Sequence, residues 1–547
     1  MTADFVITGK IYTADAEGRI AHAMAVKDGK ILAVGELPDV REFMDDSTPV
    51  LEKSGLIVPG MTEGHAHISC SGEMVFGVAL GHETDPAAYL AKIAEYAHTH
   101  PEDKVIFGSG YDNGVFGEDG PTAKLLDSVC ADRPVIMVAS DHHSRWVNSM
   151  VLDMINAHEV HDEPAESGIV RYPDGRATGW LKESAAMGLV RDVLEPMSAE
   201  KYAQAIKYYQ DIALTNGITI CFEPIFDSSH DYDVRAEGYK LLDERGELLL
   251  TCRLGYTLDP VEDIEEDFRT MLRTRDDLRD CKNVRLTTAK FFVDGVIECH
   301  TAFLREDYAD APGDRGEAIT TQAVMDDFVL RAMREGFDVH THVIGDAASD
   351  IAINAYERAQ NAISEVPGGF RNALTHVQLL WDDQMKRMAE NNIVAVVNPY
   401  WHILNPVYYD EIELPYLGEY RAANEYPVKS LLSHGISLSQ ASDFPVTVPP
   451  RTMDSLHTMV NRTEPGNLAY PPLNEKERIG VREALDILTR GGAFQLRLED
   501  RKGSLEKGKD ADFVVLTEDV FEMPREELYR CEVAETWISG RQMYKMI

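Results

Sequence analysis

Two histidines, His65 and His67, stand one residue apart just after the apolar run Leu56–Pro59. The run predicts a buried strand that ends at a glycine. Because side chains alternate along a strand, both imidazoles are expected on one face at its end. Imidazole pairs in this arrangement bind transition metals such as Zn²⁺. His-x-His pairs also occur on polar surfaces and in hydrogen-bonded cores, so the motif alone leaves both interpretations open.

Three more residues that could bind a metal or move a proton, His342, His376 and Asp443, each come at the end of a short strand-like run. Taken singly, such histidines are often only hydrogen-bonded polar residues, and such aspartates often cap the next helix. Their joint occurrence, each at the end of a predicted strand in one alternating region, is harder to explain in that way, and we expect them to converge. His340 shares a strand face with His342 and is expected to lie deeper in the core.

Lys290 lies inside the apolar run Leu286–Val293, where its side chain is expected to be buried. A buried lysine is costly unless it is neutral or paired with an acid. A neutral lysine amine can react with carbon dioxide to form a carbamate, which behaves as a carboxylate and can bridge two metal ions. An ion pair with an acid such as Asp294 is the alternative.

The elements that must position these residues alternate between strands and helices from about residue 57 to residue 500, which is the pattern of a parallel sheet. In a closed parallel barrel, the chemistry takes place at the carboxyl ends of the strands. The predicted strands include Val135–Ala139, Ile218–Phe222, Leu286–Val293, Phe337–His342, Ile393–Val397 and Ile436–Ser439, and the predicted helices include Met325–Gly336 and Ile351–Ala362.

Both ends of the chain are instead rich in predicted strands. Residues 5–12 and 23–34 have this pattern, with a tight hairpin turn expected at Asp28-Gly29. Residues 512–516 predict another strand, and residues 536–543 predict a second hairpin. Each end is too small to hold a core of its own, so we expect the two to combine into one small β-domain.

The composition is that of a large globular protein, with 547 residues of which 44% are hydrophobic. A formal net charge of −40 argues against binding of nucleic acid or of an anionic membrane surface, since both need basic patches. The 7 cysteines are scattered and never spaced as Cys-x-x-Cys, which favours reduced thiols. The sequence shows neither a signal peptide nor a membrane-spanning run, so we expect a cytoplasmic protein.

Several of these motifs together resemble the amidohydrolase superfamily, and within it the branch related to N-substituted formamide deformylase. The resemblance runs nearly from end to end of the chain. One position departs from the family pattern, because Glu63 stands where aspartate is commoner, and we expect little effect from this change. The matching segments are 57–67, 144–149, 290–295, 301–302, 342–348, 376–379, 442–446, 503–505 and 511–513.

The resemblance implies an α/β fold with a distorted TIM (β/α)8 barrel. Beside the barrel it implies a small β-sandwich built from both chain ends, and an inserted α/β segment after the first barrel strand. The expected boundaries are 57–499 for the barrel domain, 1–56 with 500–547 for the sandwich, and about 75–200 for the insertion.

The resemblance also implies two divalent metal ions, with Zn²⁺ expected and Mn, Fe or Ni as alternatives. His65 and His67 would bind the first ion, and His342 and His376 would bind the second. A carbamylated Lys290 would bridge the two ions. Asp443 would lie beside the shared hydroxide as both a metal ligand and the catalytic residue.

The chemistry expected from this site is hydrolysis of a C–N bond in a small-molecule amide or cyclic amide that is not a peptide, with N-substituted formamides among the candidates. Two close cations lower the pKa of a shared water, and Asp443 would pass its proton to the leaving amine. A mononuclear metal-dependent deaminase and a non-catalytic barrel scaffold are the alternatives. The family also suggests a homodimer. Candidate substrate contacts are Tyr111, His142, His143, Trp146, Asn148 and His300.

Overall fold

The structure is a computed structural model that describes residues 2–81, 83–116, 120–140, 143–162, 164–194, 196–225, 231–258, 264–363, 366, 368–467 and 469–547. His142, one of the candidate substrate contacts, lies outside these residues. The chain forms two compact units, the first made of residues 1–66, 210–225 and 246–547, and the second of residues 67–209 and 226–245. No helix in the described ranges is long and apolar enough to cross a membrane.

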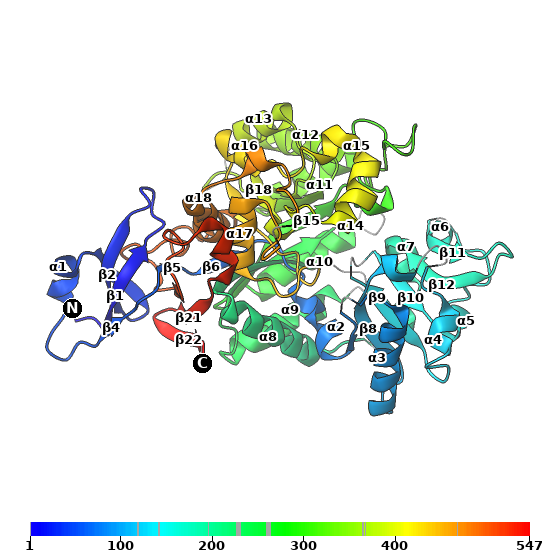
Figure 1. The fold of residues 1–547 in the computed structure, drawn as a ribbon, viewed down its shortest axis with the longest axis horizontal. Coiled ribbons are helices and arrows are strands. Elements are labelled where there is room, and N and C mark those ends of the chain that lie inside the picture. Colours follow the sequence, from blue (N-terminus) through cyan, green and yellow to red (C-terminus); the bar gives the residue numbers. More distant parts are fainter. Residues whose placement is uncertain are drawn as a thin grey trace. The chain divides into compact units, whose positions relative to one another are not determined.

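A parallel sheet forms the centre of the first unit and confirms the predicted barrel (Figure 1). The first and last strands of this sheet approach each other, as two hydrogen bonds show. The Gln440 side-chain amide donates to the Thr62 carbonyl at 2.8 Å, and the Gly64 N–H donates to the Gln440 carbonyl at 2.9 Å. The sheet is therefore nearly closed. In spatial order, its strands within the described ranges are β6 (Met61–Glu63), β13 (Ile218–Ile225), β14 (Thr251–Thr257), β15 (Val284–Phe292), β16 (Asp338–Val343), β17 (Ala373–His376), β18 (Val394–Val397) and β19 (Leu438–Gln440).

Alternation along each barrel strand decides which side chains face the interior. On β16, Thr341 faces outward and its hydroxyl lies 2.6 Å from the Tyr356 hydroxyl of helix α12 (Asp346–Ala362). His340 and His342, its neighbours in sequence, therefore face inward. On β15, Phe291 packs outward against Phe328 of helix α11 (Gln322–Arg334), which leaves Lys290 on the inner face.

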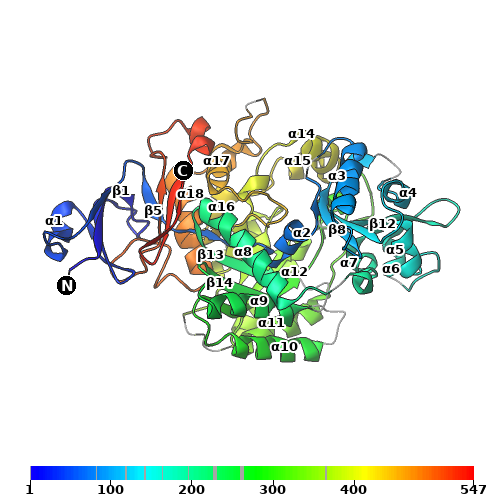
Figure 2. The same ribbon diagram turned by 90° about the horizontal axis from the view of Figure 1, so that it is seen from below.

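Helices lie on the outside of the barrel (Figure 2), and the two that were predicted with bounds, α11 and α12, come close to them. Helix α11 starts earlier than predicted because the Thr321 hydroxyl accepts the Val324 N–H at 3.4 Å and caps the first turn. Helix α12 starts directly after Gly345, ahead of the predicted residue 351. Further helices are α10 (Ile264–Asp277), α13 (Asp382–Glu390), α15 (Leu414–Ala422), α16 (Val428–Ser433), α17 (Thr452–Asn461) and α18 (Val481–Asp486).

Strands from both chain ends pair with one another, as predicted (Figure 1). Strand β5 joins them, because it pairs with an N-terminal strand on one side and with a C-terminal strand on the other. The predicted hairpin turn at Asp28-Gly29 is confirmed by positive φ angles of 49° and 74°. The strands of this sheet are β1 (Phe5–Tyr12), β2 (Ile20–Lys27), β3 (Lys30–Gly35), β4 (Val50–Glu52), β5 (Ile57–Pro59), β20 (Phe513–Leu516), β21 (Val533–Ile538) and β22 (Arg541–Lys545).

The second unit contains a separate mixed sheet, whose strands all lie between β6 and β13 in the sequence, where the inserted α/β segment was predicted. Its bounds of about 75–200 stay a prediction. In spatial order the strands are β11 (Ile169–Arg171), β12 (Ala177–Lys182), β10 (Ser144–Val147), β9 (Val135–Ala139), β8 (Ile106–Tyr111) and β7 (Val78–Ala79). Helices α3 (Pro86–Thr99), α5 (Ser149–Met154) and α9 (Tyr232–Glu244) also belong to this unit, and α8 (Ala199–Thr215) continues into the first.

Candidate metal centre

Three residues from different barrel strand ends meet at the centre of the site, as the sequence predicted. Nitrogen or oxygen atoms of His65, His376 and Asp443 all lie within 4.8 Å of one another. The His65 Nε2 is 3.2 Å from the Asp443 Oδ1, and the rings of His65 and His376 are 5.3 Å apart. All three side chains are buried. Two imidazoles and a carboxylate form a donor set that suits a divalent transition metal.

The position of His65 differs in one respect from the sequence prediction. Strand β6 ends at Glu63, so His65 and His67 lie in the loop after it, and strand alternation does not set their directions. His65 is instead held through its backbone, because its N–H donates to the Glu63 Oε1 at 3.1 Å. His67 is the first residue of the second unit, and its predicted role as a metal ligand stays a prediction.

His342 lies beside this cluster. Its ring is 4.6 Å from the ring of His376, and its Nε2 is 3.1 Å from the carbonyl oxygen of Gly295. Burial lowers the pKa of His342 well below its usual value, with the neighbouring His376 and Lys290 acting in the same direction. The ring is therefore neutral, which is the form of imidazole that binds a metal ion.

Lys290 is completely buried on the inner face of β15. Its Nζ has no hydrogen-bond partner in the described part of the chain and lies 4.5 Å from the centre of the Phe292 ring. Burial lowers the pKa of Lys290 to about 7, so an uncharged amine is accessible at neutral pH. A buried amine in this state has the chemical character that carbamate formation requires.

Within the described residues, Lys290 does not form the alternative ion pair with Asp294. The Asp294 carboxylate accepts backbone N–H groups of Phe303 at 2.9 Å, Ile344 at 3.1 Å and Gly345 at 2.8 Å. Asp294 thus joins the loop after β15 to the loop before α12. Its carboxylate is used for loop structure, which explains why it does not neutralise the lysine.

Two residues that the sequence analysis did not single out hold His376 in place. The His376 Nδ1 is 2.9 Å from the Asn398 Oδ1, and the Trp401 ring stacks on the His376 ring at 5.3 Å. Hydrogen bonding of Nδ1 leaves Nε2 as the atom that can bind a metal. Asn398 directly follows β18, so its place at a predicted strand end was the available signal.

Glu63 links the two loops that carry His65 and Asp443. Its Oε1 accepts the N–H of His65 at 3.1 Å and the N–H of Ser442 at 2.9 Å. The N–H of Asp443 in turn donates to the carbonyl oxygen of His65 at 3.0 Å. Burial raises the pKa of Glu63 to about 8. A neutral side chain therefore fixes the backbone on which both residues depend.

The backbone is strained at two of the site residues. His376 has a φ of 74° and Asp443 has a φ of 56°. Residues other than glycine rarely adopt this left-handed backbone conformation. Where they do, they are often at functional sites, where the surrounding structure holds them. The strained backbone at His376 and Asp443 is consistent with a role in directing their side chains toward the site.

The candidate substrate contacts in the second unit have structural partners there. Tyr111 and Trp146 are completely buried, and the Trp146 Nε1 donates to the Thr122 carbonyl at 2.7 Å. Asn148 caps helix α5 by accepting the Val151 N–H at 3.1 Å. The His143 Nδ1 is 3.2 Å from a carboxylate oxygen of Glu183. Contact of these four residues with substrate stays a prediction.

His300, the remaining candidate substrate contact, lies in the first unit in the loop that follows β15. Its Nε2 is 3.1 Å from an oxygen of Asp310, and its ring is 4.1 Å from the ring of Tyr416. Its contact with substrate also stays a prediction.

Comparisons with known proteins identify the family of the chain. Residues 53–544 match the family described as "Amidohydrolase family". The chain is 28% identical to the protein LONG AFTER FAR-RED 3 of Arabidopsis thaliana, over 100% of this chain and 92% of that protein. It is 26% identical to N-substituted formamide deformylase of Arthrobacter pascens, over 99% of this chain and 98% of that enzyme.

Among solved structures, a metal-dependent hydrolase from Pyrococcus furiosus has the same fold. Its TM-score is 0.71 at 23% identity, and the alignment covers 93% of this chain and 98% of that one. The family match extends across the barrel and includes β5, β20 and β21 of the sheet formed by the chain ends. The chain therefore belongs to the amidohydrolase family, as its motifs predicted.

Proposed function

We propose that this protein is a metal-dependent hydrolase that cleaves a C–N bond in a small-molecule amide or cyclic amide that is not a peptide. The observation that carries the proposal is the convergence of His65, His376 and Asp443, whose potential ligand atoms lie within 4.8 Å of one another. His342 and Lys290 lie next to them on the inner face of the barrel. Each of these five residues has a side chain that can serve in the proposed site.

The residues present fit a pair of divalent cations. His65, His376 and His342 offer imidazole nitrogens, and Asp443 offers a carboxylate. The buried Lys290 amine, without a hydrogen-bond partner in the described residues, would supply a bridging carboxylate after reaction with carbon dioxide. In that reaction a bond forms between Nζ and the carbon of carbon dioxide, and one amine proton is released. When bound, divalent cations such as Zn²⁺ activate water and polarise a substrate carbonyl.

Asp443 is the residue that would move protons in this reaction. Its carboxylate lies at the cluster, with its backbone tied to His65, so its direction is fixed before substrate arrives. It would accept a proton from the attacking water and deliver it to the nitrogen of the leaving amine as the C–N bond breaks. The negative charge of the carboxylate suits the first role, and the protonated acid suits the second.

For the substrate, the relative from Arthrobacter pascens supplies the first candidate, because it is named N-substituted formamide deformylase. At 26% identity this supports testing N-substituted formamides before other amides. Cyclic amides form the second group of candidates. A mononuclear aminohydrolase is the second proposed function, since the cluster of His65, His376 and Asp443 could also hold a single cation.

The test is hydrolysis of a panel of N-substituted formamides and cyclic amides by the full chain, after chelation and again after reloading with Zn²⁺. Release of an amine by the metal-loaded protein, lost on chelation and regained on reloading, would support the proposal. The Asp443→Asn variant serves as the control for contaminating activity. Release of ammonia from aminated heterocycles, without amide cleavage, would favour the mononuclear aminohydrolase instead.

A further inference from the structure

His340 lies in direct contact with His65. The Nε2 of His340 is 2.8 Å from the Nδ1 of His65, and the two ring centres are 4.9 Å apart. Both side chains are almost completely buried. The Nε2 of His65, on the other side of the same ring, faces Asp443 at 3.2 Å. The His65 ring therefore lies between His340 and Asp443.

The barrel sheet fixes the position of His340 relative to two of the proposed ligands, His342 and Lys290. On β16 it comes two residues before His342 and faces inward with it. Its strand partner on β15 is Lys290, and its partner on β17 is Ala373. His340 is thus part of the barrel framework, on a strand that is hydrogen-bonded on both sides.

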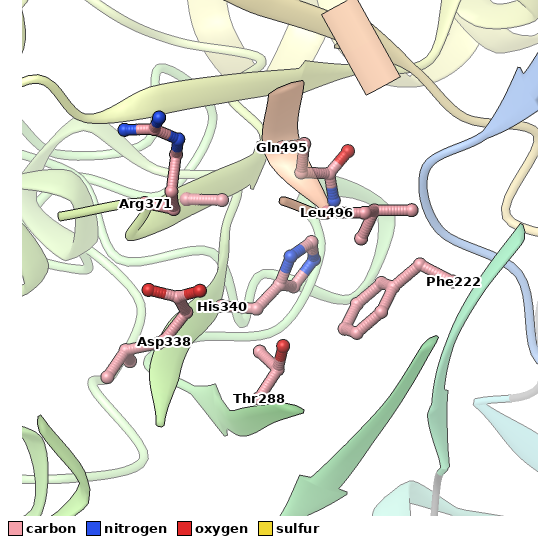
Figure 3. Close-up of a pocket in the computed structure, with 9 residues that line it drawn as sticks. Phe222, Thr288, Asp338, His340, Arg371, Gln495 and Leu496 are labelled. Carbon is pink, nitrogen blue, oxygen red and sulfur yellow. The ribbon is translucent and has the colours of Figure 1, made fainter. Parts of the chain in front are cut away.

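His340 also lines a small cavity, together with Phe222 and Gln495 (Figure 3). The Phe222 ring packs against the His340 ring at 4.8 Å between ring centres. The cavity is about large enough for one water molecule. Gln495 also lines the cavity, and its side-chain amide donates to the Gly64 carbonyl at 2.9 Å, next to His65.

We propose that His340 is a positioning residue for His65, an inference that rests on the proposed metal-dependent function. The His340 Nε2 accepts the Nδ1–H of His65, which fixes the tautomer of His65 so that its Nε2 lone pair is directed at the metal. Residues that accept the second N–H of a metal-binding histidine orient the ring and increase metal affinity. Carboxylates, carbonyls and waters usually fill this role, and here the barrel supplies an imidazole.

Two substitutions of His340 separate this role from packing. His340→Phe keeps a buried aromatic ring beside Phe222 but removes the acceptor. His340→Gln restores an acceptor oxygen on a side chain of similar reach. The control is Thr341→Val on the same strand, which breaks the buried hydrogen bond to Tyr356 of α12 and leaves the inner face unchanged.

The measurement is the dissociation constant of Zn²⁺, obtained by competition with a chromophoric chelator, together with the visible absorption spectrum of the Co²⁺-loaded protein. We expect His340→Phe to weaken Zn²⁺ binding about 10–100-fold and to alter the Co²⁺ spectrum. His340→Gln and Thr341→Val should remain close to the unaltered protein in both readouts.

Unchanged Zn²⁺ affinity in His340→Phe would overturn the positioning role while leaving the proposed function intact. Equal losses in His340→Phe, His340→Gln and Thr341→Val would also overturn it, because general destabilisation of β16 would then be the cause. Failure of the unaltered protein to bind Zn²⁺ or Co²⁺ would overturn the proposed function and this inference with it.

Discussion

The backbone N–H of Asp443 donates to the carbonyl oxygen of His65 at 3.0 Å, and the side chains of the same two residues approach to 3.2 Å. The first residue follows the last barrel strand, and the second follows the first barrel strand. Closure of the barrel therefore brings together the proposed proton carrier and a proposed metal ligand. Any change that loosens this closure should affect metal binding as well as stability.

Glu63 provides a direct test of that connection. Glu63→Ala removes the Oε1 acceptor of the His65 and Ser442 N–H groups, and each buried N–H left without a partner costs about 1–3 kcal/mol. We expect a lower unfolding midpoint and weaker Zn²⁺ binding. Glu63→Gln keeps a neutral acceptor and should resemble the unaltered protein. Equal effects of both substitutions on Zn²⁺ binding would show that the hydrogen bonds are not what positions His65.

Asp443→Asn tests the proton-transfer role. The amide keeps the shape of the side chain but cannot accept and deliver a proton, so kcat for amide hydrolysis should fall by about 10²–10⁴-fold. Because Asp443 is also a proposed ligand, kcat must be compared at equal metal content. A kcat within a few-fold of the unaltered protein would assign proton transfer to another group.

Gly64→Ala tests closure of the barrel. A Cβ at this position would lie 2.5 Å from the Ser439 Oγ and 2.7 Å from both the Gln440 carbonyl oxygen and the Gln495 Oε1. We expect destabilisation of about 1–3 kcal/mol or more, together with loss of Zn²⁺ affinity. Gly188→Ala is the control, since nothing lies within 4 Å of its Cβ position. An unfolding midpoint unchanged by Gly64→Ala would contradict the closure described above.

Much of the fold could be predicted from local patterns. The alternation of strands and helices indicated the barrel, and the apolar run around Lys290 indicated burial of a lysine that proved to have no hydrogen-bond partner in the described residues. His376 and Asp443 were expected to meet because parallel strands end at one edge of a barrel. These predictions depend only on strand period and parallel direction.

Other features depend on contacts between distant segments, which local patterns do not encode. The hydrogen bond between His65 and His340 depends on how β16 lies against the loop after β6. The sequence indicated only that His340 lies deep in the core. The Glu63 bridge requires barrel closure. Asn398 and Trp401 contact His376 because of the path that the chain takes after β18. No periodic sequence pattern predicts that path.

A buried pair of carboxyl groups, Glu413 and Glu425, makes stability depend on pH. The Gln378 side-chain amide donates to both Glu425, at 2.5 Å, and Glu413, at 3.2 Å. Burial raises the pKa of Glu425 from 4.5 to about 8. Between these values the folded protein keeps a proton that the unfolded chain releases, so the free energy of unfolding falls as pH rises through this range.

The limiting slope from this group is about 1.4 kcal/mol per pH unit, and it vanishes above pH 8. Glu425→Gln should flatten the dependence of the urea midpoint on pH between 5 and 8. Glu419→Gln is the control, because Glu419 is exposed on α15, and this substitution should leave the slope unchanged. An identical slope in Glu425→Gln would show that this carboxyl does not titrate as its burial requires.

The most direct test of the central proposal is the metal content of freshly purified protein, measured by plasma mass spectrometry beside Lys290→Ala and the exposed-lysine control Lys282→Ala. We expect about two divalent ions per chain in the unaltered protein and in Lys282→Ala, and one or fewer in Lys290→Ala. A single ion in all three proteins would contradict the bridging role of Lys290 and support a mononuclear enzyme. Protein that holds no metal and takes up none on incubation would contradict the proposed metal-dependent hydrolase.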